Sequence, residues 1–325
     1  MPDTHTRAAA PPAALADTLQ RWRYVVFDRP SWAALRAATP LALTSEELGT
    51  LRGLNEPVTP DDVTEVFLPL SRLLNLHVAA ARSLHSLVQG GFLASPVSPP
   101  PFVIGVAGSV GVGKSTFARV LRAMLARWPD HPRVELVTTD GFLHPTDVLR
   151  ARGLLHRKGF PESYDLKLML NFLAAVKAGE KQLRVPMYSH QSYDIVPGEF
   201  QTVNRPDVLI FEGLNVLQTM STAPVVASDF FDFSVYLDAE PQDIETWYVE
   251  RFLLLQRTAF HDPRSYFHHY RDLTEAQARE IGSGIWHNIN LPNLRENILP
   301  TRERARLVLR KGRTHAVREV WLRRM

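Results

Sequence analysis

One stretch, residues 102–128, constrains the fold of this chain more than any other. The apolar run FVIGVA is short enough for a buried parallel strand, and FARVLRAMLARW repeats its apolar residues at helical spacing. Between them, GSVGVGKST matches the phosphate-binding pattern G-x-x-x-x-G-K-[ST] through Gly108, Gly113, Lys114 and Ser115. A strand, a glycine-rich loop and a helix in this order predict an α/β fold with a phosphate site at the loop.

The chemistry of the loop explains its residue types. Glycines let the backbone turn tightly and point its N–H groups at phosphate oxygens, and the following helix directs its positive end to the same place. Lys114 adds a cation, and the Ser115 hydroxyl can bind Mg²⁺. A chance glycine-rich turn is the weaker explanation. We expect ATP and Mg²⁺ to bind along Gly108, Ser109, Val110, Gly111, Val112, Gly113, Lys114, Ser115 and Thr116. The fold class that follows is a P-loop NTPase-type, doubly wound, mainly parallel sheet flanked by helices.

Composition excludes several classes of protein. The net charge of +3 gives no electrostatic footprint for nucleic acid. The chain has no cysteine, which excludes disulfides, thiolate nucleophiles and cysteine zinc sites. No apolar run approaches the roughly 18 residues that span a bilayer, and the N-terminus lacks the pattern of a signal peptide. We expect a cytoplasmic protein that binds neither nucleic acid nor membrane.

The organisation of the chain follows from its proline-rich segments. Residues 1–20 are rich in alanine and proline at their start, so we expect a disordered extension. Residues 21–325 should form a single P-loop kinase-like domain. Within it, 21–94 should form a helical layer on the sheet, and 102–325 the nucleotide- and substrate-binding core. The linker 95–101, SPVSPPP, separates the two.

The helical layer carries strong start signals but no recognisable chemistry. Thr44 and Glu47 form the pattern of a capping box. Thr59 precedes a proline and two acids, which predicts a helix from about Pro60 toward Val88.

Two carboxylates follow predicted strands. Val134–Thr138 should be a strand with Asp140 just beyond it, and Pro206–Phe211 should be another with Glu212 directly after it. The carboxyl ends of parallel strands meet at one edge of the sheet, so both acids should lie near the phosphate loop. Asp140 can accept a proton from an attacking hydroxyl or bind Mg²⁺ through water; a plain Asp-Gly turn is the alternative. Glu212 has the position of the second carboxylate that holds or orients Mg²⁺.

The remaining elements are less distinct. Residues 150–200 should be loops around one helix, Leu166–Val176. Further on we expect a strand over Phe231–Leu237, a helix that begins near Pro241, and a short strand over Arg306–Leu309. Spacing alone does not show whether four polar residues of the segment 150–200 line a pocket or lie on surface loops. They are Lys158, Tyr188, His190 and Tyr193.

Arg251 shares a helical face with Tyr248, Phe252 and Leu255. An arginine among apolar side chains must either pair its guanidinium group with an anion or extend that group into water. A phosphoryl group in transfer and an internal salt bridge are both suitable partners. Asn290 can bind a polar substrate or serve as a turn residue. The sequence offers no HExxH pattern, and we propose no zinc site.

The phosphate loop alone does not select a function, because kinases, switch GTPases and motor ATPases share it. The sequence lacks the D-x-x-G and N-K-x-D patterns of switch GTPases. A small-molecule kinase needs a base and an acceptor pocket, which Asp140 and the aromatic stretch 247–270 can supply.

Eight strings in order carry a resemblance to a known family: GSVGVGKST, RVELVTTDGFLHP, KGFPESYD, YSHQSYD, EGLNVLQ, TWYVERFL, SYFHHY and NILPTRERA. From about Trp22 onward the chain resembles bacterial type I pantothenate kinase, in the superfamily of phosphoribulokinase and uridine kinase. The resemblance implies transfer of the ATP γ-phosphate to the primary hydroxyl of pantothenate, which is the first step of coenzyme A synthesis. It also implies feedback inhibition by coenzyme A and a homodimer.

The same resemblance implies roles for single residues. Lys114 and Ser115 would hold the triphosphate and Mg²⁺, Asp140 would be the base, and Arg251 would stabilise the transferring charge. The residues that match contacts of pantothenate are Tyr188, Tyr248 and Asn290. Those that match contacts of the coenzyme A phosphates are Arg119 and His190. Glu212 matches the strand-end acid of the family, and its metal role is our inference.

The chain departs from the family pattern at three places. The first twenty residues match nothing, the segment between Gln218 and Asp229 is short, and Leu255 replaces an expected aromatic beside the pantothenate tail. Two other functions stay open: a nucleoside or sugar kinase of the same superfamily, and a nucleotide-dependent regulatory module without catalysis.

Overall fold

A seven-stranded sheet forms the centre of the computed structural model, which describes residues 22–37, 39, 43–95, 97–219 and 224–324. The strand order is β1-β9-β8-β7-β2-β6-β3, and the strands from β8 to β3 are parallel. Their bounds are β1 Tyr24–Asp28, β2 Phe102–Gly108, β3 Val134–Thr138, β6 Val208–Glu212, β7 Phe233–Asp238, β8 Leu307–Lys311 and β9 Val317–Arg323. The predicted disorder of residues 1–20 lies outside the described residues.

The three central strands explain why the sheet is parallel. Every residue of β2, β6 and β7 is buried, so these strands read as continuous apolar runs rather than alternating ones. Helices cover both faces, as a parallel sheet requires, and the α/β fold class is confirmed. The prediction for Val134–Thr138 is also confirmed, whereas the strand expected from Phe231 begins at Phe233 and the strand expected from Arg306 begins at Leu307.

The antiparallel edge corrects one prediction and adds an unforeseen strand. Tyr24–Asp28 was expected in a helical layer, but it is strand β1 and pairs with β9. In turn, β9 pairs with β8 in the antiparallel sense. Five residues with a mixed exposure pattern give too weak a local signal, and the partner of β1 lies nearly 300 residues away in the chain.

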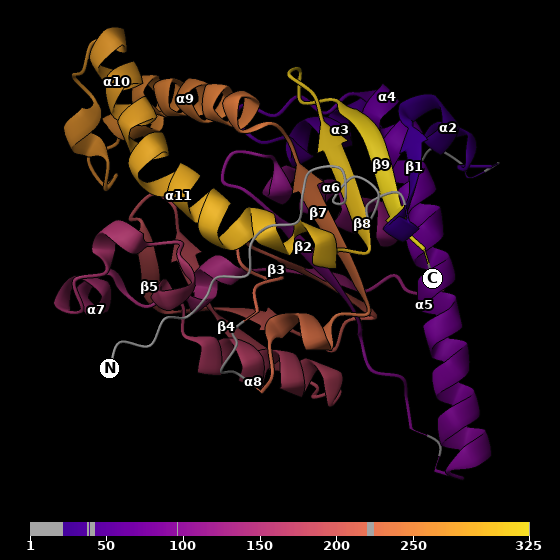
Figure 1. Cartoon of the computed structure of the whole chain (residues 1–325). Coiled ribbons are helices and arrows are strands. Elements are labelled where there is room, and N and C mark those ends of the chain that lie inside the picture. Colours follow the sequence, from indigo (N-terminus) through magenta and orange to yellow (C-terminus); the bar gives the residue numbers. More distant parts are fainter. Residues whose placement is uncertain (1–21, 38, 40–42, 96, 220–223, 325) are drawn as a thin grey trace, which may run out of the picture.

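The N-terminal helices form a layer that packs against the sheet and against α6. Both predicted start signals are confirmed: Thr44 and Glu47 form a capping box, and Thr59 caps the helix that begins at Pro60. That helix runs through α4, α5 and two π-helical turns to Phe92 and projects beyond the body of the molecule (Figure 1). The helices of this half are α2 Arg29–Ala34, α3 Ser45–Leu51, α4 Pro60–Asp62, α5 Leu68–Ser86 and α6 Lys114–Leu125.

A β-hairpin occupies much of the region that was predicted to hold loops around one helix. Strands β4 (Leu183–Ser189) and β5 (Asp194–Val203) form a separate two-stranded sheet. Buried and exposed residues do not alternate regularly along either strand, so the sequence gives no clear strand signal. The predicted helix is present as α8 (Leu166–Lys177), preceded by α7 (Thr146–Ala151). Gly141 lies against the hairpin, since a Cβ at this position would collide with the carbonyl oxygen of Pro186. The hairpin therefore sits directly beside Asp140.

A helical lobe closes the other side of the site. It contains α9 (Pro241–Arg257), α10 (Glu275–Ile285) and α11 (Leu291–Asn293), which lie together in Figure 1. A second apolar cluster stabilises the lobe: Val249, Phe252, Leu253, Phe260 and Ala278. Among the described residues, no helix is both long and apolar enough to cross a bilayer.

Candidate active site

The phosphate loop connects β2 to α6 as its sequence predicts. Gly108, Gly111 and Gly113 have φ angles of 147°, 80° and 99°, which a residue with a side chain rarely adopts. Gly113 caps α6 without a side chain, so the first N–H groups of the helix stay free to face an anion. A Cβ at Gly111 would lie 3.6 Å from the Cβ of Tyr248, which brings the loop against α9.

Lys114 is buried at the start of α6, and its Nζ donates to the carbonyl oxygen of Ser109 at 2.9 Å. Burial lowers the pKa of Lys114, while the charges of Glu212, Asp140 and Glu56 act in the opposite direction. An ammonium group can donate three hydrogen bonds, and a polyphosphate beside the loop could accept those that Ser109 does not. The loop is therefore arranged around an anion.

Glu212 and Ser115 offer the oxygen ligands that Mg²⁺ prefers. Glu212 is the last residue of β6, and it pairs with Val106 of β2 and Thr138 of β3. The Ser115 hydroxyl donates to Oε1 of Glu212 at 3.4 Å, whereas the buried Oε2 has no hydrogen-bond partner among the described residues. An unpartnered buried carboxylate oxygen beside a hydroxyl fits a Mg²⁺ ion whose remaining ligands are phosphate oxygens and water. No group of three or more carboxylate or imidazole ligands exists among the described residues.

Stability should depend on pH through Glu212. Burial raises its pKa to about 7, with a further contribution from the charge of Asp140 and opposing ones from Lys114 and Ser115. Because the folded protein holds this proton more tightly than the unfolded chain, the free energy of unfolding should fall between the ordinary glutamate pKa of about 4.3 and pH 7. Above that window the slope should vanish. We expect Glu212→Gln to remove this loss, so that its Tm relative to the wild type rises as the pH is raised.

Thermal unfolding from pH 4.5 to 8 without Mg²⁺ measures this effect. Glu180→Gln, which changes an exposed glutamate after α8, serves as the matched control and should follow the wild type. A constant Tm difference between Glu212→Gln and the wild type at every pH would refute the assignment.

Asp140 lies in a short 3₁₀ turn at the end of β3, and its charge reaches both Lys114 and Glu212. Its side chain is 33% exposed, so it can meet a substrate. The hairpin brings His190 to it, with Nε2 3.8 Å from Oδ2 of Asp140. The ring of Tyr188 lies 5.2 Å from that of His190. These three predicted residues thus lie on one wall, beside the loop.

Tyr248, Arg251 and Asn290 form the facing wall. Tyr248 and Arg251 lie on α9, and Asn290 ends the π-helical turn before α11. Burial raises the pKa of Tyr248, and the nearby Asn290 side chain and the charge of Arg251 counteract this shift. Arg251 also acts on the pKa of Lys114. The structure therefore brings the base candidate, the loop lysine and the acceptor-side residues to one site.

Comparisons with known proteins identify the family of the chain. Residues 103–251 fit the model of the phosphoribulokinase/uridine kinase family. The pantothenate kinase of Sorangium cellulosum (strain So ce56) is 59% identical over 303 residues, which are 93% of this chain and 98% of that protein. The pantothenate kinase of Brevibacillus brevis (strain 47) is 53% identical over 309 residues, 93% of this chain and 96% of that protein. The chain belongs to the pantothenate kinase family. It is an ATP-dependent kinase.

Distant structures share the fold of this family. D-glycerate 3-kinase from Cryptococcus neoformans superimposes with a TM-score of 0.52 at 17% identity, covering 76% of this chain and 97% of that one. At this identity the likeness concerns the fold alone.

One residue near the phosphate loop of this pantothenate kinase family member is not predicted by the sequence. Lys311 ends β8, and its Nζ donates to the carbonyl oxygen of Val112 in the loop at 2.8 Å. Burial lowers the pKa of Lys311 to about 8, partly offset by Glu56. A Cβ at Gly113 would lie only 2.8 Å from this Nζ, so the third glycine leaves room for the lysine. No sequence signal links residues that lie 199 positions apart.

The sequence does not decide whether Lys158 lines a pocket or lies on a surface loop. It is buried under the hairpin, where its Nζ donates to Thr146 Oγ1 at 3.1 Å and to the carbonyl oxygen of Tyr193. Burial lowers its pKa to about 8, while Asp194 and Asp140 act against that shift. Its ammonium also lies 4.0 Å from the centre of the Tyr193 ring. Lys158 therefore supports the wall that carries Tyr188 and His190.

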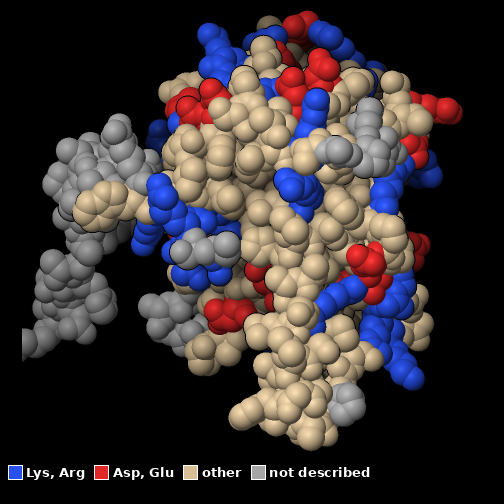
Figure 2. Space-filling model, turned by 90° about the vertical axis from the view of Figure 1, so that its right-hand side faces the viewer, with Lys and Arg blue, Asp and Glu red and all other residues tan. Residues whose placement is uncertain are grey.

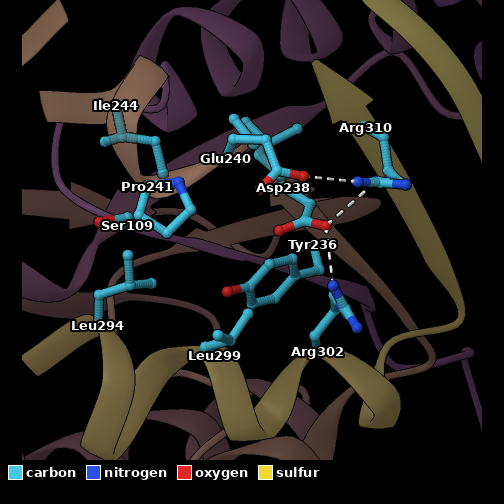
Figure 3. Close-up of a pocket in the computed structure, with 12 residues that line it drawn as sticks. Ser109, Tyr236, Asp238, Glu240, Pro241, Ile244, Leu294, Leu299, Arg302 and Arg310 are labelled. Atoms are coloured by element: carbon cyan, nitrogen blue, oxygen red, sulfur yellow. Dashed lines mark hydrogen bonds and ion pairs between the residues drawn. The ribbon is translucent and has the colours of Figure 1, made fainter. Parts of the chain in front are cut away.

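A small cavity of about 100 Å³ lies behind Ser109 (Figure 3). Asp238, at the end of β7, pairs there with Arg302 at 3.1 Å and with Arg310 at 3.5 Å. Burial raises the pKa of Asp238, and the two arginines oppose that shift. The Ser109 hydroxyl is buried, and the part of the chain that the structure describes offers it no hydrogen-bond partner. These ion pairs hold the end of β7, β8 and the turn after α11 together next to the loop.

Two further predicted residues make contacts within the protein. Arg119 on α6 donates from Nε to the carbonyl oxygen of Leu51 at 3.0 Å and from a terminal nitrogen to Thr116 Oγ1 at 3.1 Å. Leu255, which replaces an expected aromatic, packs against the second apolar cluster of the helical lobe.

Proposed function

We propose that this chain is a pantothenate kinase, which transfers the γ-phosphate of ATP to pantothenate and forms 4'-phosphopantothenate, the first step of coenzyme A synthesis. The observation that carries the proposal is the convergence of the loop, two strand-end acids and two facing walls with tyrosine, histidine and asparagine. The 53–59% identity to proteins named pantothenate kinase over most of the chain supports the choice of acceptor.

The proposed reaction is a direct in-line transfer. Asp140 orients the primary hydroxyl of pantothenate and takes its proton as the oxygen attacks the γ-phosphorus. Lys114 and Arg251 offset the negative charge that spreads over the transferring oxygens. Mg²⁺, bound by Ser115 with Glu212 beside it, would supply charge neutralisation between the β- and γ-phosphates. Tyr188, Tyr248 and Asn290 would hold the polar groups of pantothenate.

An acceptor comparison tests the substrate. We expect ADP to form with ATP and Mg²⁺ when pantothenate is added, and to remain at background with uridine, with glycerate or without acceptor. Turnover with uridine in place of pantothenate would favour a nucleoside kinase. ATP binding without turnover on any acceptor would favour a regulatory module.

Coenzyme A should inhibit the enzyme through Arg119 and His190. The charge of Arg119 acts on Glu212, and Nε2 of His190 lies 3.8 Å from Asp140, so both residues lie near the phosphate site. A guanidinium is well suited to phosphate. We expect Arg119→Ala to weaken coenzyme A inhibition about 10- to 100-fold, the loss typical of a charged hydrogen bond. The KM for ATP should change much less. Inhibition assays at several ATP concentrations measure both values.

Arg122→Ala is the matched control, because Arg122 is an exposed arginine one turn further along α6. It should leave both constants unchanged. Equal losses of coenzyme A inhibition and ATP use in Arg119→Ala would argue against a separate inhibitor contact.

We also propose a homodimer through the projecting end of α5. The last turn of α5 exposes Leu84 at 64%, and the π-helical segment that continues it exposes Leu87 and Phe92 at 67% and 84%. Residues 84 and 87 lie one turn apart and so share a face. In Figure 2 the lower projection of the molecule shows no blue or red side chains, in contrast to the charged body. An apolar helix end that extends from the body would be costly in water, and a second copy of the chain can bury it.

The mass in solution tests this proposal. Sedimentation should give twice the chain mass of 36.7 kDa for the wild type and a single chain for Leu84→Glu/Leu87→Glu. Leu54→Glu, which changes a leucine that is 61% exposed outside this patch, should stay dimeric. A monomeric wild type, or a double variant that remains dimeric, would exclude this interface.

A further inference from the structure

A groove with four arginines lies at the edge of the sheet opposite the phosphate loop. It has a volume of about 380 Å³, and the arginines that line it are Arg23, Arg304, Arg306 and Arg323. Phe233 and Ser234, at the start of β7, contribute to its floor. The phosphate loop follows the other end of the parallel strands, so the groove is separate from the site described above.

The sheet fixes the positions of three of these arginines. Arg306 precedes β8, Arg323 ends β9 and Arg23 precedes β1, and these strands are neighbours. The N–H of Arg323 donates to the carbonyl oxygen of Arg306 at 2.8 Å, and that of Arg324 to Arg23 at 2.8 Å. With strands spaced about 4.8 Å apart, the three backbones span roughly 10 Å of one edge. The side chains of all three arginines line one groove, and gathering like charges costs stability unless an anion joins them.

None of these arginines has a carboxylate partner among the described residues. Arg304 donates to the neutral hydroxyl of Ser228 at 3.0 Å, and Arg23, Arg306 and Arg323 form no side-chain ion pair within the part of the chain that the structure describes. Arg302 differs, since it bonds Asp238. The guanidinium groups of the groove are therefore available to a ligand.

Two of the three acids that line the groove pair with cations other than its four arginines. Asp232 pairs with Lys177 at 2.7 Å and accepts the N–H of Val103 at 2.7 Å. Asp229 accepts the N–H of Val226 at 2.9 Å, and Glu303 pairs with Arg302 at 3.3 Å. The four arginines thus outnumber the three acids of the groove, and two of those acids pair with Lys177 and Arg302 instead.

The neighbouring His77 senses this positive charge. Burial lowers the pKa of His77, and the charge of Arg306 lowers it further. A guanidinium presents a planar pair of donors that matches phosphate oxygens. A single phosphate is too small to meet arginines spread over roughly 10 Å, whereas two linked phosphates can. The volume of the groove suits a small molecule.

We propose that the arginine groove binds a small molecule that carries two or more phosphate groups, at a site distinct from the catalytic one. This inference goes beyond the proposed function and does not depend on it. Inorganic pyrophosphate is the simplest probe. Because pyrophosphate can also enter the phosphate loop, the titration is made without Mg²⁺ in Lys114→Ala protein, whose loop lacks its phosphate-binding cation.

Isothermal titration should show pyrophosphate bound to Lys114→Ala protein, with inorganic phosphate at least tenfold weaker. Adding Arg306→Ser and Arg323→Ser should weaken pyrophosphate binding at least tenfold, since each removes charged hydrogen bonds. Adding Arg36→Ser, which changes an exposed arginine at the end of α2, should not. In the otherwise wild-type chain, the two groove substitutions should leave turnover with ATP and pantothenate unchanged.

Unchanged pyrophosphate affinity after the two substitutions would overturn the proposal, as would the absence of binding to Lys114→Ala protein. If the double substitution lowers Tm without ligand, Arg304→Ser decides instead, because Ser228 is the one side-chain partner of this exposed residue within the described part of the chain. It should keep the wild-type Tm and lose pyrophosphate affinity; full affinity would contradict the site.

Discussion

Replacing Asp140 by asparagine should reduce kcat by about 10²- to 10⁴-fold, the contribution of a positioned general base. The amide keeps the size and the turn after β3 but cannot accept the hydroxyl proton. ATP should still bind, because the loop, Lys114 and Ser115 remain in place. Steady-state turnover with pantothenate and equilibrium binding of a nonhydrolysable ATP analogue measure the two properties separately.

Asp147→Asn is the control for this variant. Asp147 lies on α7, and its side chain is 91% exposed beside Arg150. It should retain wild-type turnover. If Asp140→Asn also turned over at a near-normal rate, Asp140 would not be the base.

Replacing Arg251 by alanine should reduce kcat by about 10³-fold or more, as for other arginines that stabilise phosphoryl transfer. Its charge reaches the loop lysine from α9, so it is placed to neutralise the group in transfer. Because this contact is strongest in the transition state, the KM values for ATP and pantothenate should change little. Initial rates over a grid of both substrates measure the three constants.

Arg257→Ala, at the end of the same helix, tests whether loss of any arginine from α9 has this effect. Arg257 pairs with Glu275 at the surface, and its loss should leave kcat unchanged. A rise in the KM for pantothenate with an unchanged kcat in Arg251→Ala would make Arg251 a substrate-binding residue instead.

The parts of this fold that the sequence predicts are those with strong local signals. The buried strand β2, the loop glycines and α6 form one continuous unit, and capping residues mark the starts of α3 and α4. Asp140 and Glu212 could be placed because parallel strands end at one edge. For these elements local preference and tertiary structure agree.

The parts that the sequence missed depend on distant partners. Strand β1 exists because β9 lies beside it, and the hairpin β4–β5 pairs with no strand of the main sheet but packs against β3 and the turn that follows it. Lys311 reaches the loop only because β8 lies next to β7. Neither periodicity nor composition encodes such pairings. The resemblance to the family supplied the roles of Tyr188, Tyr248 and Asn290, whose spacing in the chain is uninformative.

The most direct test of the account follows the γ-phosphoryl group itself. In a single turnover with γ-labelled ATP, Mg²⁺ and excess pantothenate, the label should pass to 4'-phosphopantothenate, with none left on the protein and none released as inorganic phosphate. The Asp140→Asn variant should bind the labelled ATP and leave the label there. Labelled protein, or labelled phosphate released at the same rate without pantothenate, would contradict direct transfer at this site.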